Sequence, residues 1–337
     1  MPIETHIFAA GAYRKAKEVY VKDGGAWRDL KEIWVNDQGV WRKVFTKFFE
    51  FNADISGFNY NLRDAVIATG QWDGVTPVLA NLRVVGNLGS NPPPPPGGGS
   101  DDPNVYVTRR NRMNAYVNYP AFDSGNLPPS SEINLTVMPG AYLVGGGGCG
   151  GSAYTTTNRS ATAPDGRYFI DIVLEAGGPG TPAIRTSCLT RITNNGVIGG
   201  GGGGGAGGLG PFATQYWSGV QFNSFAVGGN GGSGAGYVPG TVENSFATSN
   251  SGTVGHGQVG TLTTGGSGGQ PNGFGGARPG TPGGRGGDLG QKGGDAGSQL
   301  SGDPADLKRS GGAPGAAVIG SSNVIWQAYG DVRGPLA

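Results

Sequence analysis

Residues 196–210 of this chain read GVIGGGGGGGAGGLG, and this stretch decides between two architectures. Glycine loses more backbone freedom on folding than other residues and has no side chain to bury. Ordering each residue costs roughly 1 to 2 kcal/mol of conformational entropy, whereas a net hydrogen bond returns about 0.5 to 1.5 kcal/mol. The stretch is therefore either a flexible tether or an element stabilised by its backbone and by apolar residues elsewhere.

The composition separates this chain from ordinary globular enzymes. Glycine makes up 70 of the 337 residues, and charged residues make up 14%, against about 25% in typical soluble domains. Hydrophobic residues reach 36% and the net charge is +1, which also differs from a charged disordered chain. Such a near-neutral chain offers no basic surface for an anionic membrane or for nucleic acid. We therefore expect no nucleic-acid partner.

Few residues are available for disulfide or metal chemistry. Cys149 and Cys188 make no disulfide framework and are interpreted as free or buried thiols. Two histidines are too few for a histidine metal site or a His-dependent triad. The N-terminus lacks a basic start followed by a long apolar stretch, and no apolar run is long enough to cross a bilayer. We expect synthesis in the cytoplasm, with no metal and no cofactor.

A 14-residue repeat occupies the N-terminus. KEVYVKDGGAWRDL (17–30) aligns with KEIWVNDQGVWRKV (31–44), and IETHIFAAGAYRKA (3–16) is a weaker copy. Each copy has an alternating extended stretch, a turn with glycine and a second extended stretch, which predicts a β-hairpin. We expect the three hairpins to pack their aromatic faces together in a module over residues 1–48. The repeat aligns Tyr13 with Trp27 and Trp41, and the arginines that follow them, Arg14, Arg28 and Arg42, align as well. These pairs either stack arginine on an aromatic ring in a core or form a platform for a ligand.

The next residues predict a small α+β segment over 49–90. An amphipathic run over 62–69 follows Asn61, a plausible N-cap, and ends at Gly70. A strand over 80–85 comes next. Residues 91–104 contain five prolines followed by glycines, which is typical of a linker or a surface loop. Residues 105–144 form a β region, with a strand over 105–119 and a strand and turn before the first glycine block.

Glycine is concentrated in residues 145–337, where it is often spaced by three. Gly284, Gly287, Gly290 and Gly293 are one such series. A left-handed extended helix has three residues per turn, so this spacing places the glycines on one face. Neighbouring helices can then approach closely enough for their backbones to hydrogen-bond. The fold class we predict is mainly β and irregular: the three-hairpin module, the α+β segment, and a bundle of polyglycine-II-like helices within one chain or between chains. A disordered tether is the alternative.

Motifs for catalysis and nucleotide binding are weak. GxGxxG matches arise by chance among so many glycines, and no lysine closes a phosphate-binding loop. Residues 283–291 match a calcium-binding nonapeptide except that Gly290 replaces the apolar residue. No catalytic constellation is visible in the sequence. We therefore expect a protein that is not an enzyme.

Three motifs carry a resemblance to a known family. They are the hairpin repeat VYVKDGGAWRDL and IWVNDQGVWRKV, the stretch YNLRDAVIATGQWDGVTPVLANLRV, and the block ITNNGVIGGGGGGGAGG. The chain resembles glycine-rich tail proteins of tailed bacteriophages over residues 17–85 and 192–320. The glycine-rich part is similar in type to distal tail-fibre adhesins of T-even-like phages, in which polyglycine II helices form a rigid core and loops at one end contact a host receptor. Those adhesins lack this hairpin module, and the loops here follow no motif that matches residue by residue.

The resemblance implies a protein of the virion tail, at the tail tip or on a fibre. Its partners would be other phage tail proteins and a bacterial surface receptor, either an outer-membrane protein or a polysaccharide. Fibres favour a homotrimer, whereas a single cap at the tip is the other arrangement. The alternative function is a structural spacer or plug without receptor contact.

Aromatic residues in the insertions are the candidate receptor contacts, because aromatic residues dominate binding hot spots. They are Tyr216, Trp217, Phe222, Phe225, Tyr237 and Phe246. The same rings could instead cap the glycine bundle as its hydrophobic core. Candidate docking residues in the N-terminal module are Tyr13, Trp27, Trp41, Arg28 and Arg42.

Overall fold

The computed structural model is mainly β, as the sequence predicts. It describes residues 6–9, 12–15, 19–23, 25–30, 32–37, 39–91, 119–151, 153–162, 168–174, 176–208, 212–217, 220–225, 231–238, 255–271, 281–296 and 309–337. Within these ranges no helix is long and apolar enough to span a membrane. The predicted strand over 105–119 and the Pro/Gly stretch over 91–104 lie almost wholly outside the described residues.

Each copy of the N-terminal repeat forms an antiparallel hairpin. The pairs are β1 (His6–Ala9) with β2 (Ala12–Lys15), β3 (Val19–Asp23) with β4 (Ala26–Leu30), and β5 (Glu32–Asp37) with β6 (Val40–Thr46). Gly25 and Gly39 occupy the turns with φ of 87°, which a residue with a Cβ rarely adopts. The hairpins form three separate two-stranded sheets.

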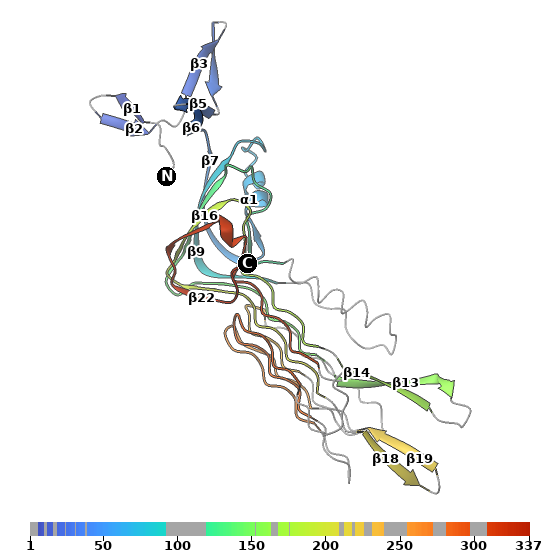
Figure 1. Ribbon diagram of the computed structural model, residues 1–337. Coiled ribbons are helices and arrows are strands. Elements are labelled where there is room, and N and C mark those ends of the chain that lie inside the picture. The colour runs from blue at the N-terminus through green and yellow to red at the C-terminus, as the bar shows by residue number, and fades with distance from the viewer. Residues whose placement is uncertain are drawn as a thin grey trace.

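The centre of the molecule is a domain of parallel strands wound in successive coils, here called the coil domain (Figure 1). Its first coil contains β7 (Phe49–Phe58), β8 (Tyr60–Asn61), α1 (Leu62–Ala68) and β9 (Val78–Gly89). The second contains β10 (Phe122–Asp123), β11 (Glu132–Val137) and β12 (Tyr142–Val144). The third contains β15 (Ile184–Arg185), β16 (Leu189–Asn194) and β17 (Val197–Gly199). The last contains β20 (Val318–Ile319), a 3-10 turn (Ser321–Asn323), β21 (Val324–Ala328) and β22 (Asp331–Arg333).

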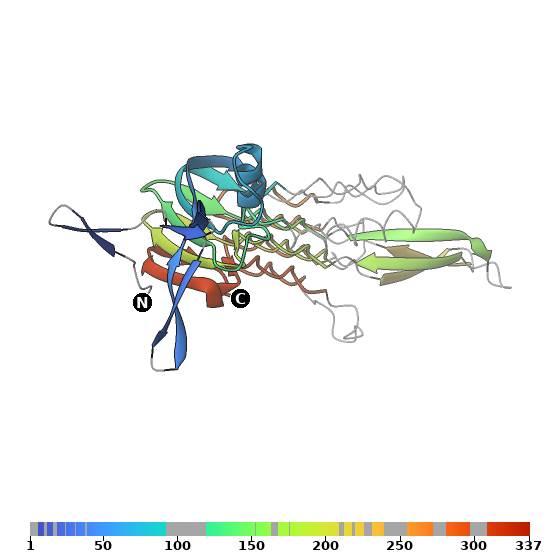
Figure 2. The same ribbon diagram turned by 90° about the horizontal axis from the view of Figure 1, so that it is seen from above.

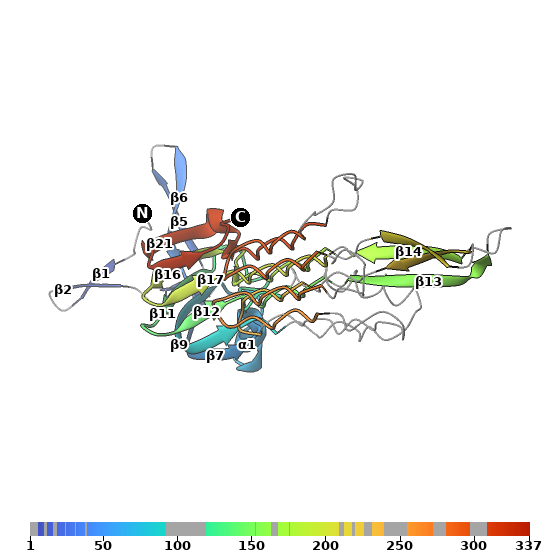
Figure 3. The ribbon, with the colours of Figure 1, turned by 90° about the horizontal axis from the view of Figure 1, so that it is seen from below.

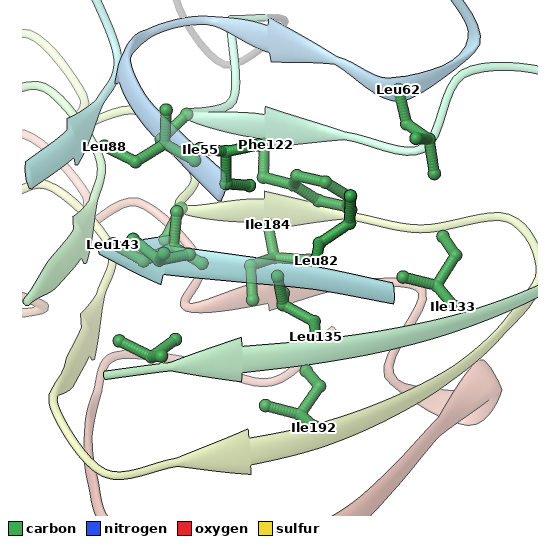
Figure 4. Packing of buried hydrophobic residues seen from close by; sticks show 14 of the residues in the cluster. Ile55, Leu62, Leu82, Leu88, Phe122, Ile133, Leu135, Leu143, Ile184 and Ile192 are labelled. Carbon is green, nitrogen blue, oxygen red and sulfur yellow. The ribbon is translucent and has the colours of Figure 1, made fainter. Parts of the chain in front are cut away.

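Successive coils pair in parallel, so equivalent residues stack in rows. Leu82, Leu135 and Ile192 form one row, and all three are buried. Phe122 stands beside Ile184 in the register of the short strands. Figure 4 shows these side chains converging on the interior of the coils. Full burial of each such side chain contributes roughly 1.5–3 kcal/mol, so this core supplies the apolar burial that the glycines lack.

Local signals within the coil domain behave as predicted. The side chain of Asn61 accepts a hydrogen bond from the Asp64 amide at 3.1 Å and so caps α1. Gly70 follows the helix with a φ of 66°. The predicted strand over 80–85 lies inside β9, and the strand and turn before the first glycine block are β11 and the turn to β12.

The glycine-rich part leaves and re-enters the coil domain between coils. After β12 the chain departs and returns as β15, and after β17 it departs again and returns as β20. These excursions form extended segments that lie side by side, without assigned helix or strand (Figures 1 and 3). The described segments are 145–151, 176–183, 200–208, 231–238, 255–271, 281–296 and 309–317. Two hairpins interrupt the excursions: β13 (Ala153–Thr162) with β14 (Tyr168–Leu174), and β18 (Phe212–Trp217) with β19 (Val220–Phe225).

Candidate functional site

The molecule has two ends of different construction. The N-terminal hairpins β1–β6 lie at one end, next to the coil domain (Figure 1). Hairpins β13–β14 and β18–β19, here called the distal hairpins, lie at the other end, beyond the glycine segments, in all three ribbon views (Figures 1, 2 and 3). The glycine segments therefore hold the distal hairpins away from the coil domain.

The candidate docking residues belong to the second strands of the N-terminal hairpins. Tyr13 lies in β2, Trp27 and Arg28 in β4, and Trp41 and Arg42 in β6. The side chain of Trp41 is 65% exposed, and Arg28 is exposed as well. On the first strands, the rings of Tyr20 and Trp34 are each 49% exposed. These described rings are therefore not buried together in a shared core.

The quoted glycine stretch lies at the centre of the glycine segments. Residues 200–206 are here called the central segment. The amides of residues 201–206 donate hydrogen bonds to three neighbouring segments in rotation, so every third amide points to the same neighbour. Gly201 and Gly204 donate to Thr181 and Gly178, Gly202 and Gly205 donate to Ala235 and Gly232, and Gly203 and Ala206 donate to Gln291 and Gly294. Its carbonyls accept by the same rule from the segments 145–151 and 309–317, at Gly148 and Gly312 among others. They also accept at Gly287, which precedes the turn of segment 281–296, whereas Gln291 and Gly294 follow that turn.

Close packing explains why glycine fills the central segment. A Cβ atom on Gly203 would lie 1.9 Å from the carbonyl oxygen of Gly312, and one on Gly204 would lie 1.8 Å from that of Cys149. Real Cβ atoms do not approach backbone this closely. Three glycines of the predicted series donate to the central segment: Gly284, Gly287 and Gly290 donate to Ala206, Gly203 and Gly200. The fourth, Gly293, donates to Gly312 instead.

A small apolar cluster lies where the glycine segments meet the coil domain. Val144, Ala235 and Leu289 are buried in it, and Tyr142, Val197, Tyr237 and Leu262 pack against it. We call these seven residues the junction cluster. Leu289 fills the space over Gly199, where a Cβ would lie 2.5 Å from the leucine side chain.

Among the candidate receptor residues, Tyr237 lies in the junction cluster. Its ring is half-buried, contacts Phe58 at a centroid distance of 5.0 Å, and covers Gly89, which has no side chain to obstruct it. Tyr216 and Trp217 lie in β18, and Phe222 and Phe225 lie in β19, all on one distal hairpin. Phe246 lies outside the described residues. The structure thus brings four of the candidates together and places Tyr237 elsewhere.

Two carboxylates of the glycine segments, Asp288 and Asp295, are engaged in structural contacts. Asp288, the acidic residue of the calcium-like nonapeptide, accepts from the Gly265 amide at 3.0 Å and from the Arg285 guanidinium at 2.6 Å. A hydrogen bond from Lys292 and one from the Gly311 amide lower the pKa of Asp295. Within the described residues no group of His, Cys, Asp and Glu is arranged to hold a metal ion.

Neither Cys149 nor Cys188 forms a disulfide in the structure, and both are buried. Burial raises the pKa of the Cys188 thiol to about 11. A hydrogen bond from Thr186 lowers this pKa, but by less than burial raises it. Cys188 is part of the hydrophobic core of the coil domain. Its thiol therefore stays protonated at neutral pH and behaves as a small apolar group.

Two residues with structural roles, Leu289 and Asn194, could not be recognised as such from the sequence. Leu289 carries no periodic signal, because glycines surround it. Asn194 is buried, and its amide donates to the carbonyls of Tyr329 at 3.0 Å and Asp331 at 2.9 Å, which ties one coil to the next. The Asn-Asn-Gly turn was recognisable in the sequence, but its partners in the last coil were not.

Comparisons with known proteins identify the family. The model of the family described as phage tail fibre adhesin Gp38 matches residues 48–337. One similar solved structure is the gp37–gp38 adhesin tip complex of the bacteriophage S16 long tail fiber, at 23% identity and a TM-score of 0.43, over 87% of this chain and 83% of that chain. No curated protein matches the chain. The family match covers the coil domain, the glycine segments and the distal hairpins alike, so this chain belongs to the Gp38 family of phage tail fibre adhesins, receptor-binding proteins of the virion tail.

Proposed function

We propose that this adhesin docks to the tail fibre through its N-terminal hairpins and contacts the host receptor through its distal hairpins. The observation that carries the proposal is the separation of the two sets of hairpins to opposite ends of the molecule (Figure 2). One end is then free to meet the fibre while the other meets the cell. The partners are another tail-fibre protein and a receptor on the bacterial surface.

The proposed spacer between these ends is a bundle of polyglycine-II-like helices. Its support is the three-residue period of the hydrogen bonds of the central segment, which has neighbours on all sides. Each segment is held by backbone bonds to several others, so no segment bends independently. Such a bundle keeps the distal hairpins in place without a large hydrophobic core or disulfides.

The proposed docking module consists of the three hairpins acting together. Its contact residues are Tyr13, Trp27, Trp41, Arg28 and Arg42. The exposure of Trp41 supports contact with a partner, because a large exposed ring is a typical interface anchor. The equivalent turn glycines of the second and third hairpins, Gly25 and Gly39, support a partner that offers equivalent sites.

The proposed receptor contacts are Tyr216, Trp217, Phe222 and Phe225 on hairpin β18–β19, together with Phe246. Tyr237 is proposed to stabilise the junction cluster, since its ring packs on Phe58 and Gly89. The receptor is an outer-membrane protein or a polysaccharide. The role of this protein is binding, not catalysis.

The test uses the purified full-length protein in two assays. In the first, the protein competes with phage for adsorption to host cells, and we expect inhibition that rises with concentration. In the second, the protein co-purifies with the tail-fibre protein, and the mass of that complex gives the number of copies, one or three. Trp41→Ala should weaken fibre binding by at least about ten-fold and leave adsorption competition unchanged.

Two outcomes would contradict this assignment. A folded protein that binds the fibre but does not compete for adsorption would favour the alternative, a structural spacer within the tail. Release of reducing ends from host capsule or lipopolysaccharide by the purified protein would identify an enzyme instead.

A further inference from the structure

The N-terminal repeat lies outside the part of the chain that matches the family. The family model begins at residue 48, whereas the last of the three hairpins ends with β6 at Thr46. The fold that the family shares thus does not account for a tandem repeat of one 14-residue unit. Linked copies of a unit in one chain offer the same binding surface more than once.

The repeat places ring-bearing residues at equivalent positions of the strand register. Tyr20 in β3 pairs with Asp29, and Trp34 in β5 pairs with Lys43 at the equivalent position of the next copy. His6 occupies the same register position in the first hairpin. The rings of Tyr20 and Trp34 are each 49% exposed. The second and third hairpins therefore present an aromatic ring to a partner at the same place.

The described side chains distinguish an exposed face from a half-buried one. Trp41 is 65% exposed, and it pairs with Asn36, two positions beyond Trp34, which puts both tryptophans on one face. Val19 precedes Tyr20 and pairs with Leu30, so these two residues belong to the other face, and both are half-buried. We call the exposed face, with Tyr20, Trp34 and Trp41, the aromatic face.

The three hairpins do not join into one sheet. Each forms its own two-stranded sheet, and β1–β2 and β3–β4 point in different directions (Figures 1 and 2). An isolated two-stranded hairpin is only marginally stable in water, because one pair of strands buries little apolar surface. A partner that covers the aromatic face therefore stabilises each hairpin as it binds.

Short connections keep the bases of the hairpins together. Residues 16–18 join β2 to β3, and Lys31 alone joins β4 to β5. At about 3.5 Å per residue, these connections span at most about 14 Å and about 7 Å. The hairpins therefore diverge from one small area and cannot spread along an extended surface. Three equivalent sites around one point are what identical chains offer where they meet at a threefold axis.

We propose that the three hairpins bind the three identical chains of a threefold-symmetric fibre end, one hairpin to each chain, and that the aromatic face packs on an apolar patch of each chain. This inference rests on the proposed docking of the N-terminal hairpins. It adds Tyr20 and Trp34 to the contact residues and assigns one adhesin to three fibre chains. A single chain meets three equivalent sites because it carries three copies of one binding element.

The first test changes the number of repeats in the full-length protein. Deletion of residues 17–30 removes one complete hairpin and leaves the junction unchanged, because residues 17–18 and 31–32 are both Lys-Glu. Binding to the purified tail-fibre protein should weaken by at least about ten-fold, since one of three linked contacts is lost. A second, inserted copy of residues 17–30 should change binding by less than about two-fold, because a threefold end has no fourth site.

The second test uses substitutions on the aromatic face. Tyr20→Ala and Trp34→Ala should each weaken fibre binding by at least about five-fold, and the double variant should bind more weakly still. Tyr329→Ala is the matched control, because this ring in the last coil is also 49% exposed, and it should change fibre binding by less than about two-fold. The mass of the complex should equal one adhesin and three fibre chains.

The outcomes separate this inference from the function on which it rests. If the protein does not bind the fibre, or if a variant without residues 3–30 binds as tightly as the unmodified protein, docking by the hairpins itself fails. If the deletion of 17–30 weakens binding but the inserted copy strengthens it by about ten-fold, or if the complex holds three adhesins, the hairpins dock and the threefold match is wrong. Equal losses in Tyr20→Ala and Tyr329→Ala would exclude the aromatic face as the contact.

Discussion

At the scale of single residues, the central segment depends on the absence of side chains. Gly203→Ala places a Cβ 1.9 Å from the Gly312 carbonyl oxygen, and neither backbone has room to move within its ring of neighbours. We expect a loss of about 3 kcal/mol or more in the free energy of unfolding, measured in urea. Gly86→Ala is the matched control, because a Cβ there meets only Ser56 at 3.7 Å, an ordinary contact. Equal stability of the two variants would contradict the close packing of the central segment.

Asn194 is a second residue whose removal should be costly. Asn194→Ala leaves the carbonyls of Tyr329 and Asp331 without the amide that they share, at a position that is 2% exposed. Leaving buried groups unsatisfied costs roughly 1–3 kcal/mol each, and thermal unfolding should show a clearly lower midpoint. The neighbouring Asn195→Ala at an exposed position should change stability by less than about 0.5 kcal/mol. An unchanged midpoint of thermal unfolding in Asn194→Ala would show that water replaces the amide.

The Cys188 thiol should be unreactive in the folded protein. Burial raises its pKa to about 11, so almost no thiolate is present at pH 8, and the thiolate is the reactive species. We expect iodoacetamide to modify Cys188 only after unfolding, as followed by mass spectrometry of the peptide that contains it. The raised pKa also predicts that stability falls as the pH rises from about 9 to about 11, because the unfolded thiol ionises first. Rapid modification of the native protein at pH 8 would contradict the burial of this core position.

At the scale of elements, the turn that carries Leu289 closes the junction between the glycine segments and the coil domain. Leu289 is 2% exposed and packs with Val144 and Ala235. Leu289→Ala leaves a cavity and should cost about 2–5 kcal/mol in the free energy of unfolding. Leu336→Ala, at a side chain that is 42% exposed, is the control and should cost much less. Similar losses in the two variants would mean that the junction cluster contributes little to stability.

At the scale of the whole molecule, the coil domain makes the glycine-rich part dependent on residues far away in the sequence. A fragment of residues 48–337 keeps every coil and loses only hairpins that form their own two-stranded sheets. We expect it to unfold within a few degrees of the full-length protein. A fragment of residues 140–337 lacks β9, β10 and β11, which pair with the retained strands β12, β15 and β16, and should show no cooperative unfolding in calorimetry. Cooperative unfolding of the shorter fragment would establish that the glycine segments fold alone.

Several elements of this protein follow from short stretches of sequence alone. The hairpins are predictable because the turn glycines and the alternating strands lie within 14 residues of each other. Helix α1 is predictable because its cap and its stop, Asn61 and Gly70, adjoin it. The aromatic residues of β18 and β19 could be named as candidate contacts because they stand out from a background of glycine. All these signals act between neighbours in the chain.

The remaining features were decided only by the tertiary structure. The coils pair strands such as β16 and β21, which more than a hundred residues separate in the sequence, and no local pattern specifies such a partner. For the same reason, the sequence could place neither Tyr237 against Gly89 nor Leu289 against Gly199. The sequence by itself determined that glycine is often spaced by three residues. Which neighbour each amide meets was decided by the tertiary structure, because the strands of the coil domain fix where the segments 145–151, 176–183, 200–208 and 309–317 begin or end.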